Sequence, residues 1–79
     1  QGLRKEVNNM DIFIKEYNAK VKTLEFVKKA YGKCNFGSVD SSYQYLLGYA
    51  NALYDCGLIT SIDLQKAFDI TEKLFEEFK

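Results

Sequence analysis

Residues 31–58, YGKCNFGSVDSSYQYLLGYANALYDCGL, decide the fold expected for this chain. Between positions 35 and 59 only Asp40 and Asp55 are ionised at neutral pH. When the stretch is placed on a helix at about 100° per residue, apolar side chains cover most of the circumference. A helix of this kind is buried on more than one side, so a second helix over about residues 41–56 is expected at the centre of the molecule.

Local signals mark the ends of this helix and the start of the next one. Ser41 with a glutamine three residues later predicts a capping box at the helix start. Gly57 followed by Leu58 predicts a left-handed stop with an apolar contact. Thr60 and Asp63 then predict the cap of a third helix over about residues 61–78, which has well-separated apolar and polar faces.

The first helix is predicted over residues 3–31 from an apolar repeat with alternating steps of four and three. It would be about 43 Å long, against about 22 Å and 27 Å for the others, so a second chain is expected to cover its N-terminal half. Alternatively, Asn8-Asn9 caps a shorter helix that begins near Met10, and the chain is a compact monomer. The self-association residues predicted on this helix are Val7, Met10, Phe13, Ile14, Tyr17, Val21 and Leu24.

Together these patterns predict an all-α fold in one domain, residues 1–79. It would be a three-helix antiparallel bundle with a long first helix, assembled as a homodimer or a higher homo-oligomer. The 79-residue chain is 47% hydrophobic and has no proline, which suits helices. No apolar run is long enough to cross a membrane, and no signal peptide is recognised at the start. Two cysteines make no disulfide framework, so a reducing, cytoplasmic location is expected.

The composition argues against catalysis and metal binding. The chain has no histidine, which removes the commonest general base and metal ligand at neutral pH. Cys34 has Lys33 beside it and is a formal nucleophile, but with no base available an ordinary thiol is favoured. We therefore expect no enzyme activity, no metal and no cofactor.

Residues 36–41, FGSVDS, offer one remote alternative. Asp40-Ser41 at a helix start resembles the Asp-Ser of acyl carrier proteins, and this resemblance implies a phosphopantetheine arm on Ser41. The chain departs from that family because Ser42 replaces a leucine, the following helix lacks an acidic face, and the first helix is too long. The favoured interpretation is that Asp40 and Ser41 cap the second helix.

The function expected from these features is that of a protein-interaction module, a regulator, adaptor or inhibitor of a larger protein that also binds itself. Ile12 and Phe26 lie on the first helix opposite its apolar seam, so they are candidates for partner contacts. Tyr45 and Tyr49 lie one turn apart at the edge of the central helix, and tyrosine is enriched in interfaces. Packing in the core explains the two tyrosines equally well.

Nucleic-acid binding is the alternative function. Lys15, Lys22, Lys29 and Lys33 fall on one ridge of the first helix, where they could follow phosphates. Residues 1–33 carry a net charge of +4 and residues 34–79 a net charge of −4. Because the third helix would meet DNA with an acidic face, we do not expect nucleic acid as the main partner. The lysines could instead face the acidic helix of the same or a neighbouring chain.

Overall fold

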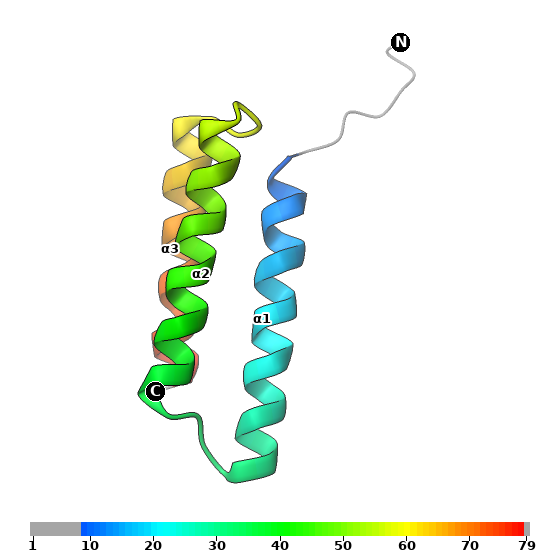
Figure 1. Ribbon diagram of the computed structural model, residues 1–79, viewed down its shortest axis with the longest axis vertical. Helices are drawn as coiled ribbons and strands as arrows, with labels where there is room; N and C mark the ends of the chain where they lie inside the picture. Colours follow the sequence, from blue (N-terminus) through cyan, green and yellow to red (C-terminus); the bar gives the residue numbers. More distant parts are fainter. Residues whose placement is uncertain (1–8, 79) are drawn as a thin grey trace.

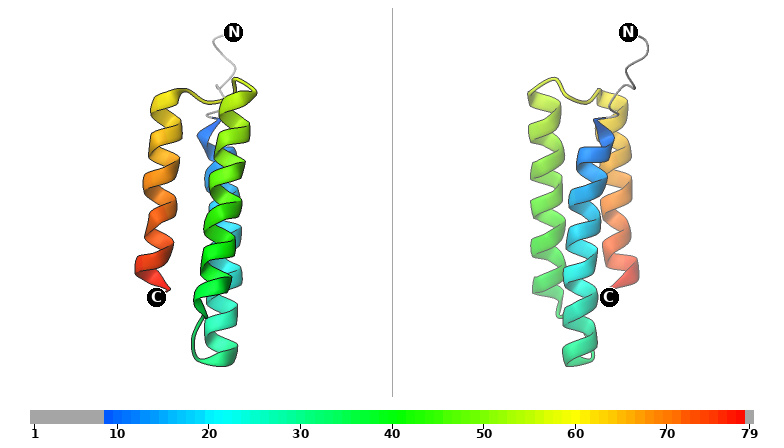
Figure 2. Two further views of the ribbon diagram at one scale, coloured as in Figure 1. Left: turned by 60° about the vertical axis from the view of Figure 1, so that its left-hand side comes forward. Right: turned by 90° about the vertical axis from the view of Figure 1, so that its right-hand side faces the viewer.

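The computed structural model describes residues 9–78 as three helices, α1 (Met10–Tyr31), α2 (Phe36–Asp55) and α3 (Ser61–Glu77), with no strand among these residues. The helices lie side by side, and each runs antiparallel to the one before it, so that α1 and α3 point the same way (Figure 1). The turned views place α1 against both other helices (Figure 2). The prediction of an all-α fold with three helices is confirmed.

The first helix begins at Met10, the alternative start that Asn8-Asn9 had indicated. Asn9 takes the N-cap position without a side-chain cap hydrogen bond, and the predicted residues 3–8, Val7 among them, lie outside the described part of the chain. With 22 residues in α1 and 20 in α2, the two helices are about 33 Å and 30 Å long. The described α1 is therefore not too long for its neighbours to cover.

The second helix begins five residues earlier than the predicted Ser41. The Asn35 side chain accepts a hydrogen bond from the Ser38 backbone N–H at 2.8 Å and caps the helix there. Asparagine is as good an N-cap as serine. The earlier start also adds a turn that buries Val39, which is 2% exposed. The predicted capping box at Ser41 is therefore wrong, and Ser41 lies inside the helix.

The turn between α2 and α3 confirms the local prediction. Gly57 adopts a positive φ of 76°, and the N–H of Leu58 donates to the Leu53 carbonyl at 2.9 Å, as in a Schellman stop. Thr60 and Asp63 form a reciprocal capping box, in which the Asp63 N–H donates to the threonine hydroxyl at 3.1 Å. Side chain and backbone therefore fix both ends of this short connection.

All three helices contribute to one apolar core. Its buried members are Met10, Phe13, Leu24, Cys34, Val39, Leu46, Ala50, Leu53, Ile59, Ala67, Leu74 and Phe78. Thr71 is also buried, and its hydroxyl donates to the Ala67 carbonyl at 2.6 Å, so it leaves no polar atom unpaired. Of the predicted self-association residues, Met10, Phe13 and Leu24 are buried in this core, and Ile14, Tyr17 and Val21 pack against it.

Candidate functional site

The loop between α1 and α2, residues 32–35, shapes one end of the bundle. Gly32 ends α1 with a positive φ of 85°, and its N–H donates to the Lys28 carbonyl at 2.7 Å. Asn35 then starts α2, so the chain has little length in which to reverse direction. Within it Cys34 turns inward and is 9% exposed, and its Sγ donates to the Leu24 carbonyl at 3.1 Å. The thiol thus serves to fix the loop.

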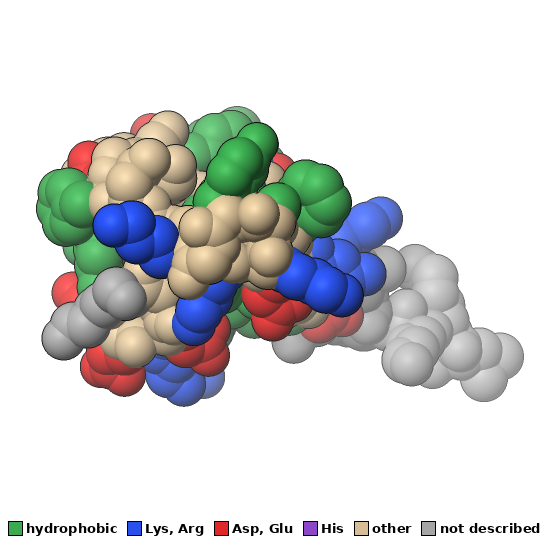
Figure 3. Space-filling view, turned by 90° about the horizontal axis from the view of Figure 1, so that it is seen from below, with side chains coloured by type: hydrophobic (Ala, Val, Ile, Leu, Met, Phe, Trp, Pro, Cys, Tyr) green, Lys and Arg blue, Asp and Glu red, His purple; other side chains and the backbone are tan. Residues whose placement is uncertain are grey.

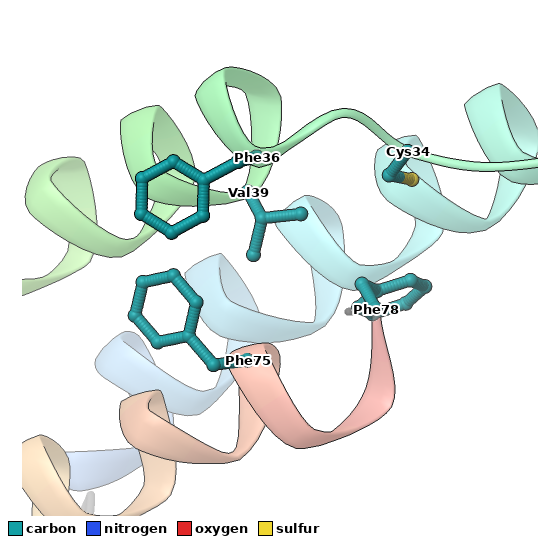
Figure 4. A pocket seen from close by; sticks show the side chains of 5 residues that line it. All are labelled: Cys34, Phe36, Val39, Phe75 and Phe78. Carbon is teal, nitrogen blue, oxygen red and sulfur yellow. The ribbon is translucent and has the colours of Figure 1, made fainter.

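An apolar pocket of about 450 Å³ lies between this loop and the last turn of α3. In Figure 4, Phe36 and Phe75 lie on one side of it and Cys34 and Phe78 on the other, with Val39 between them. The rings of Phe36 and Phe75 stack with centroids 5.8 Å apart and planes 22° apart. The pocket therefore combines a loop, the start of one helix and the end of another.

The pocket has an aromatic wall that stays open to solvent. Phe36 is 72% exposed although it stacks on Phe75, and Phe75 in turn touches the Tyr43 ring at 4.7 Å between centroids. In the view from this end of the bundle, hydrophobic side chains reach the surface beside lysine side chains (Figure 3). Large exposed apolar side chains around a concave site are typical of a binding surface.

A charged hollow of about 380 Å³ adjoins this pocket. It is lined by Glu25, Lys28, Lys29, Glu77 and Phe78, so Phe78 borders both spaces. Carboxylates and ammonium groups are both present there. A partner whose apolar side chain enters the pocket therefore meets polar groups of either sign at the rim, as is usual in protein interfaces.

The pocket has an almost wholly apolar lining. Its lining side chains are hydrocarbon except for the Cys34 thiol, which already donates a hydrogen bond to the backbone. In residues 9–78 no group of three or more histidine, cysteine or acidic side chains could hold a metal ion. The site can exclude water from an apolar group and stack against an aromatic ring.

Tyr45 and Tyr49 lie one turn apart on α2. Their rings stack with centroids 6.0 Å apart, and the Lys20 ammonium sits 4.1 Å from the Tyr45 centroid. The Tyr45 hydroxyl donates to the Glu16 carboxylate, and this hydrogen bond is the main reason why the pKa of Tyr45 is raised. Tyr45 is 46% exposed. Tyr45 therefore joins α2 to α1, while Tyr49 stacks on Tyr45 and packs against the core. The role of both tyrosines toward a partner stays a prediction.

The remaining predicted partner residues lie elsewhere. Ile12 and Phe26 are exposed on the side of α1 that faces away from the core, at 36% and 70%. Neither lines the pocket at the loop end. The predicted partner residues therefore form no single site.

The predicted lysine ridge is only partly a row on one helix. Lys15, Lys22 and Lys29 are exposed along α1, whereas Lys33 lies in the loop beyond the end of that helix. Lys29 also lines the charged hollow.

The structure removes the local basis of the carrier alternative. Asp40 and Ser41 lie within α2, which starts at Phe36, so the Asp-Ser pair is not at a helix start. Ser41 is exposed. The resemblance to acyl carrier proteins places the Asp-Ser pair at a helix start, and Asn35 takes the cap position instead.

The two cysteines are free and differ in burial: Cys34 is buried, and Cys56 is exposed at the end of α2.

None of the helices described between residues 9 and 78 has the length and hydropathy of a membrane span. Comparisons with protein-family models, with curated proteins and with solved structures gave no match for this chain.

Sequence reasoning assigned the pocket residues to other roles. Phe75 and Phe78 were expected on the apolar face of the third helix, and Phe36 was placed in a loop. The available signal in the sequence is a set of phenylalanines, Phe36, Phe75 and Phe78, which would form an aromatic site if they met at the same end of the bundle. That meeting depends on the position at which α3 ends against the loop, which no local pattern gives.

Proposed function

We propose that this chain is a small non-enzymatic protein-interaction module that regulates, adapts or inhibits a larger protein. The observation that supports the proposal best is the open apolar pocket at the loop end with its exposed Phe36. A pocket of this size suits one aromatic or branched aliphatic anchor side chain of a partner. The charged hollow beside the pocket offers ammonium and carboxylate groups that can bind the backbone N–H and C=O groups of the partner around such an anchor.

The partner's anchor gains by leaving water. Burial of a large apolar side chain contributes about 1.5–3 kcal/mol, and stacking on an aromatic ring adds about 0.5–1.5 kcal/mol. One anchor alone therefore gives weak binding, and specificity requires further contacts at the rim. Such a modest affinity allows a regulator to release its partner readily.

The first experiment titrates isotope-labelled protein with N-acetyl-phenylalaninamide and N-acetyl-leucinamide and follows backbone amide shifts. We expect saturable shifts at Cys34, Phe36, Val39, Phe75 and Phe78. Phe36→Ala should weaken binding at least about tenfold, because it removes one wall of the pocket. Phe26→Ala is the matched control, since Phe26 is 70% exposed on α1 and lines neither the pocket nor the charged hollow. Equal binding by both variants, or shifts scattered over the surface, would contradict the proposal.

Nucleic-acid binding is a second candidate, supported by the exposed row of Lys15, Lys22 and Lys29 on α1. Binding through this row should fall steeply as salt is raised and should be lost in the double variant Lys22→Glu with Lys29→Glu. A labelled single strand and a duplex, each titrated at low and high salt, decide the matter. If binding does not depend on salt, or if the double lysine variant still binds, nucleic-acid binding through this row is excluded.

A further inference from the structure

The side of α1 that faces away from the core carries a second regular pattern. At about 100° per residue, two rows of exposed side chains run along this side, about 60° apart. Each row repeats every seven residues. The rows are Ile12, Ala19 and Phe26 in one, and Lys15, Lys22 and Lys29 in the other. We call these six residues the α1 outer face.

The side of α3 that faces away from the core has the same spacing and the opposite charge. Its exposed residues follow steps of three and four, as the α1 outer face does. They are Ile62, Gln65, Asp69, Glu72 and Glu76, which we call the α3 outer face. Ile62 is 69% exposed although it is a large apolar side chain. The face therefore has an apolar N-terminal end and three carboxylates.

The charges on the two faces are unpaired within the described chain. Across residues 9–78, Lys15, Lys22 and Lys29 form no ion pair, and neither do Glu72 and Glu76. Among the described residues, the only side-chain hydrogen bond between members of the α3 outer face runs from the Gln65 amide to the Asp69 carboxylate, at 3.2 Å. Three ammonium groups and three carboxylates are thus free to meet charges on another molecule.

From this complementarity we propose that copies of the chain associate head to tail, with the α1 outer face of one copy docked on the α3 outer face of the next. A parallel alignment places Ile12 opposite Ile62 and Lys22 opposite Glu72. Asp69 then lies between the levels of Lys15 and Lys22, and Glu76 between those of Lys22 and Lys29. Steps of three and four on both helices are the spacing that lets two helices pack along a common seam.

The occupant is a second copy because the same molecule supplies both complementary faces. The two faces differ, so each contact leaves one α1 face and one α3 face free for further copies. Such a contact either closes into a ring or continues as a chain of molecules. It contains few large apolar residues, so we expect weak, salt-sensitive association. This inference is separate from the apolar pocket, whose lining residues belong to neither face, and only Lys29 is shared with the charged hollow beside it.

The test uses charge reversal in two variants. One variant carries Lys15→Glu with Lys22→Glu, and the other carries Asp69→Lys with Glu72→Lys. All four positions are exposed, so both variants should fold, and circular dichroism with thermal melting checks this. Sedimentation velocity over a range of concentrations at low salt should find association in the unmodified chain and association at least about tenfold weaker in each variant alone.

An equimolar mixture of the two variants is the decisive measurement. The reversed α1 face of one variant matches the reversed α3 face of the other, so mixing should restore association. The control Lys66→Glu with Lys73→Glu changes the net charge as much as the first variant, but it adds carboxylates at the edge of the α3 outer face, so it should associate at least as strongly as the unmodified chain. A mixture that stays as dissociated as its components, or an unmodified chain that is monomeric at every concentration, would overturn the proposal. The titration of the pocket with N-acetyl-phenylalaninamide tests the proposed function, and its outcome does not depend on whether the chain associates with itself.

Discussion

At the end of the bundle where α2 turns into α3, a Schellman stop and a reciprocal capping box close the chain, whereas the α1–α2 loop at the opposite end leaves a large aromatic ring in solvent. Gly57 and the Thr60 capping box tie the first connection to both helices, and Ile59 between them is only 6% exposed. The α1–α2 connection has its own glycine stop at Gly32, together with the Asn35 cap and the inward Cys34 thiol. Phe36 next to it remains 72% exposed. The α2–α3 end, which we call the closed end, buries its linking residue Ile59, whereas the α1–α2 end, which we call the open end, keeps an exposed ring beside a pocket.

The largest difference between the two ends should appear when an apolar side chain is removed from each. Ile59→Ala should lower the free energy of unfolding by about 2–4 kcal/mol, because it opens a cavity in the closed end. Phe36→Ala should cost less than about 1 kcal/mol, since most of that ring is already in water. Urea titration followed by circular dichroism measures both. Similar losses from the two variants would break the distinction between a closed and an open end.

The helix caps give the next largest effect. Asn35→Ala should cost about 1 kcal/mol because it removes the acceptor for the Ser38 N–H. Ser41→Ala, within α2, should change the free energy of unfolding by less than about 0.5 kcal/mol. Thermal melts of both variants and the unmodified chain provide the comparison. A larger loss from Ser41→Ala than from Asn35→Ala would restore the later helix start.

The smallest effect concerns alkaline pH. Burial, and secondarily the charge of Glu77 at the end of α3, raises the pKa of Tyr17 above its ordinary value of 10.0. As pH rises, the unfolded chain loses this proton first, so the contribution of Tyr17 to stability is complete below about pH 10 and is lost as pH rises through the folded-state pKa.

Denaturant titrations at several alkaline pH values, with tyrosinate absorbance as the second readout, test this contribution. The comparison is with Tyr17→Phe, which removes only this phenol hydroxyl. We expect stability to fall less steeply with pH in that variant. An unchanged slope would mean that Tyr17 titrates alike in the folded and unfolded chains.

The two connections also differ in how far sequence could predict them. The α2–α3 turn was predicted correctly because a glycine stop and a capping box act between residues only a few positions apart. The α1–α2 loop was predicted too long because Asn35 and Ser41 are both good caps. The choice between them depends on burial of Val39 in a core that the local sequence does not specify.

The apolar repeat predicted on the first helix also shows what local sequence can and cannot specify. The apolar repeat of the first helix correctly identified a face that is packed, for example at Phe13 and Leu24. The need for a second chain rested on a helix of about 43 Å, whereas the described α1 is about as long as α2. The pocket could not be predicted, because it requires Phe78 at the end of α3 to meet the loop that holds Cys34.

The contrast between Cys34 and Cys56 also makes the molecule convenient to label. Cys56 is exposed at the α2 end, whereas Cys34 is buried with its Sγ bonded to the Leu24 carbonyl. A brief maleimide reaction should therefore attach one fluorophore or spin label at Cys56 without any substitution. The slower rate of Cys34 modification would then report how often the loop opens transiently. The unmodified protein thus carries both a reporter site and a gauge of local unfolding at opposite ends of one helix.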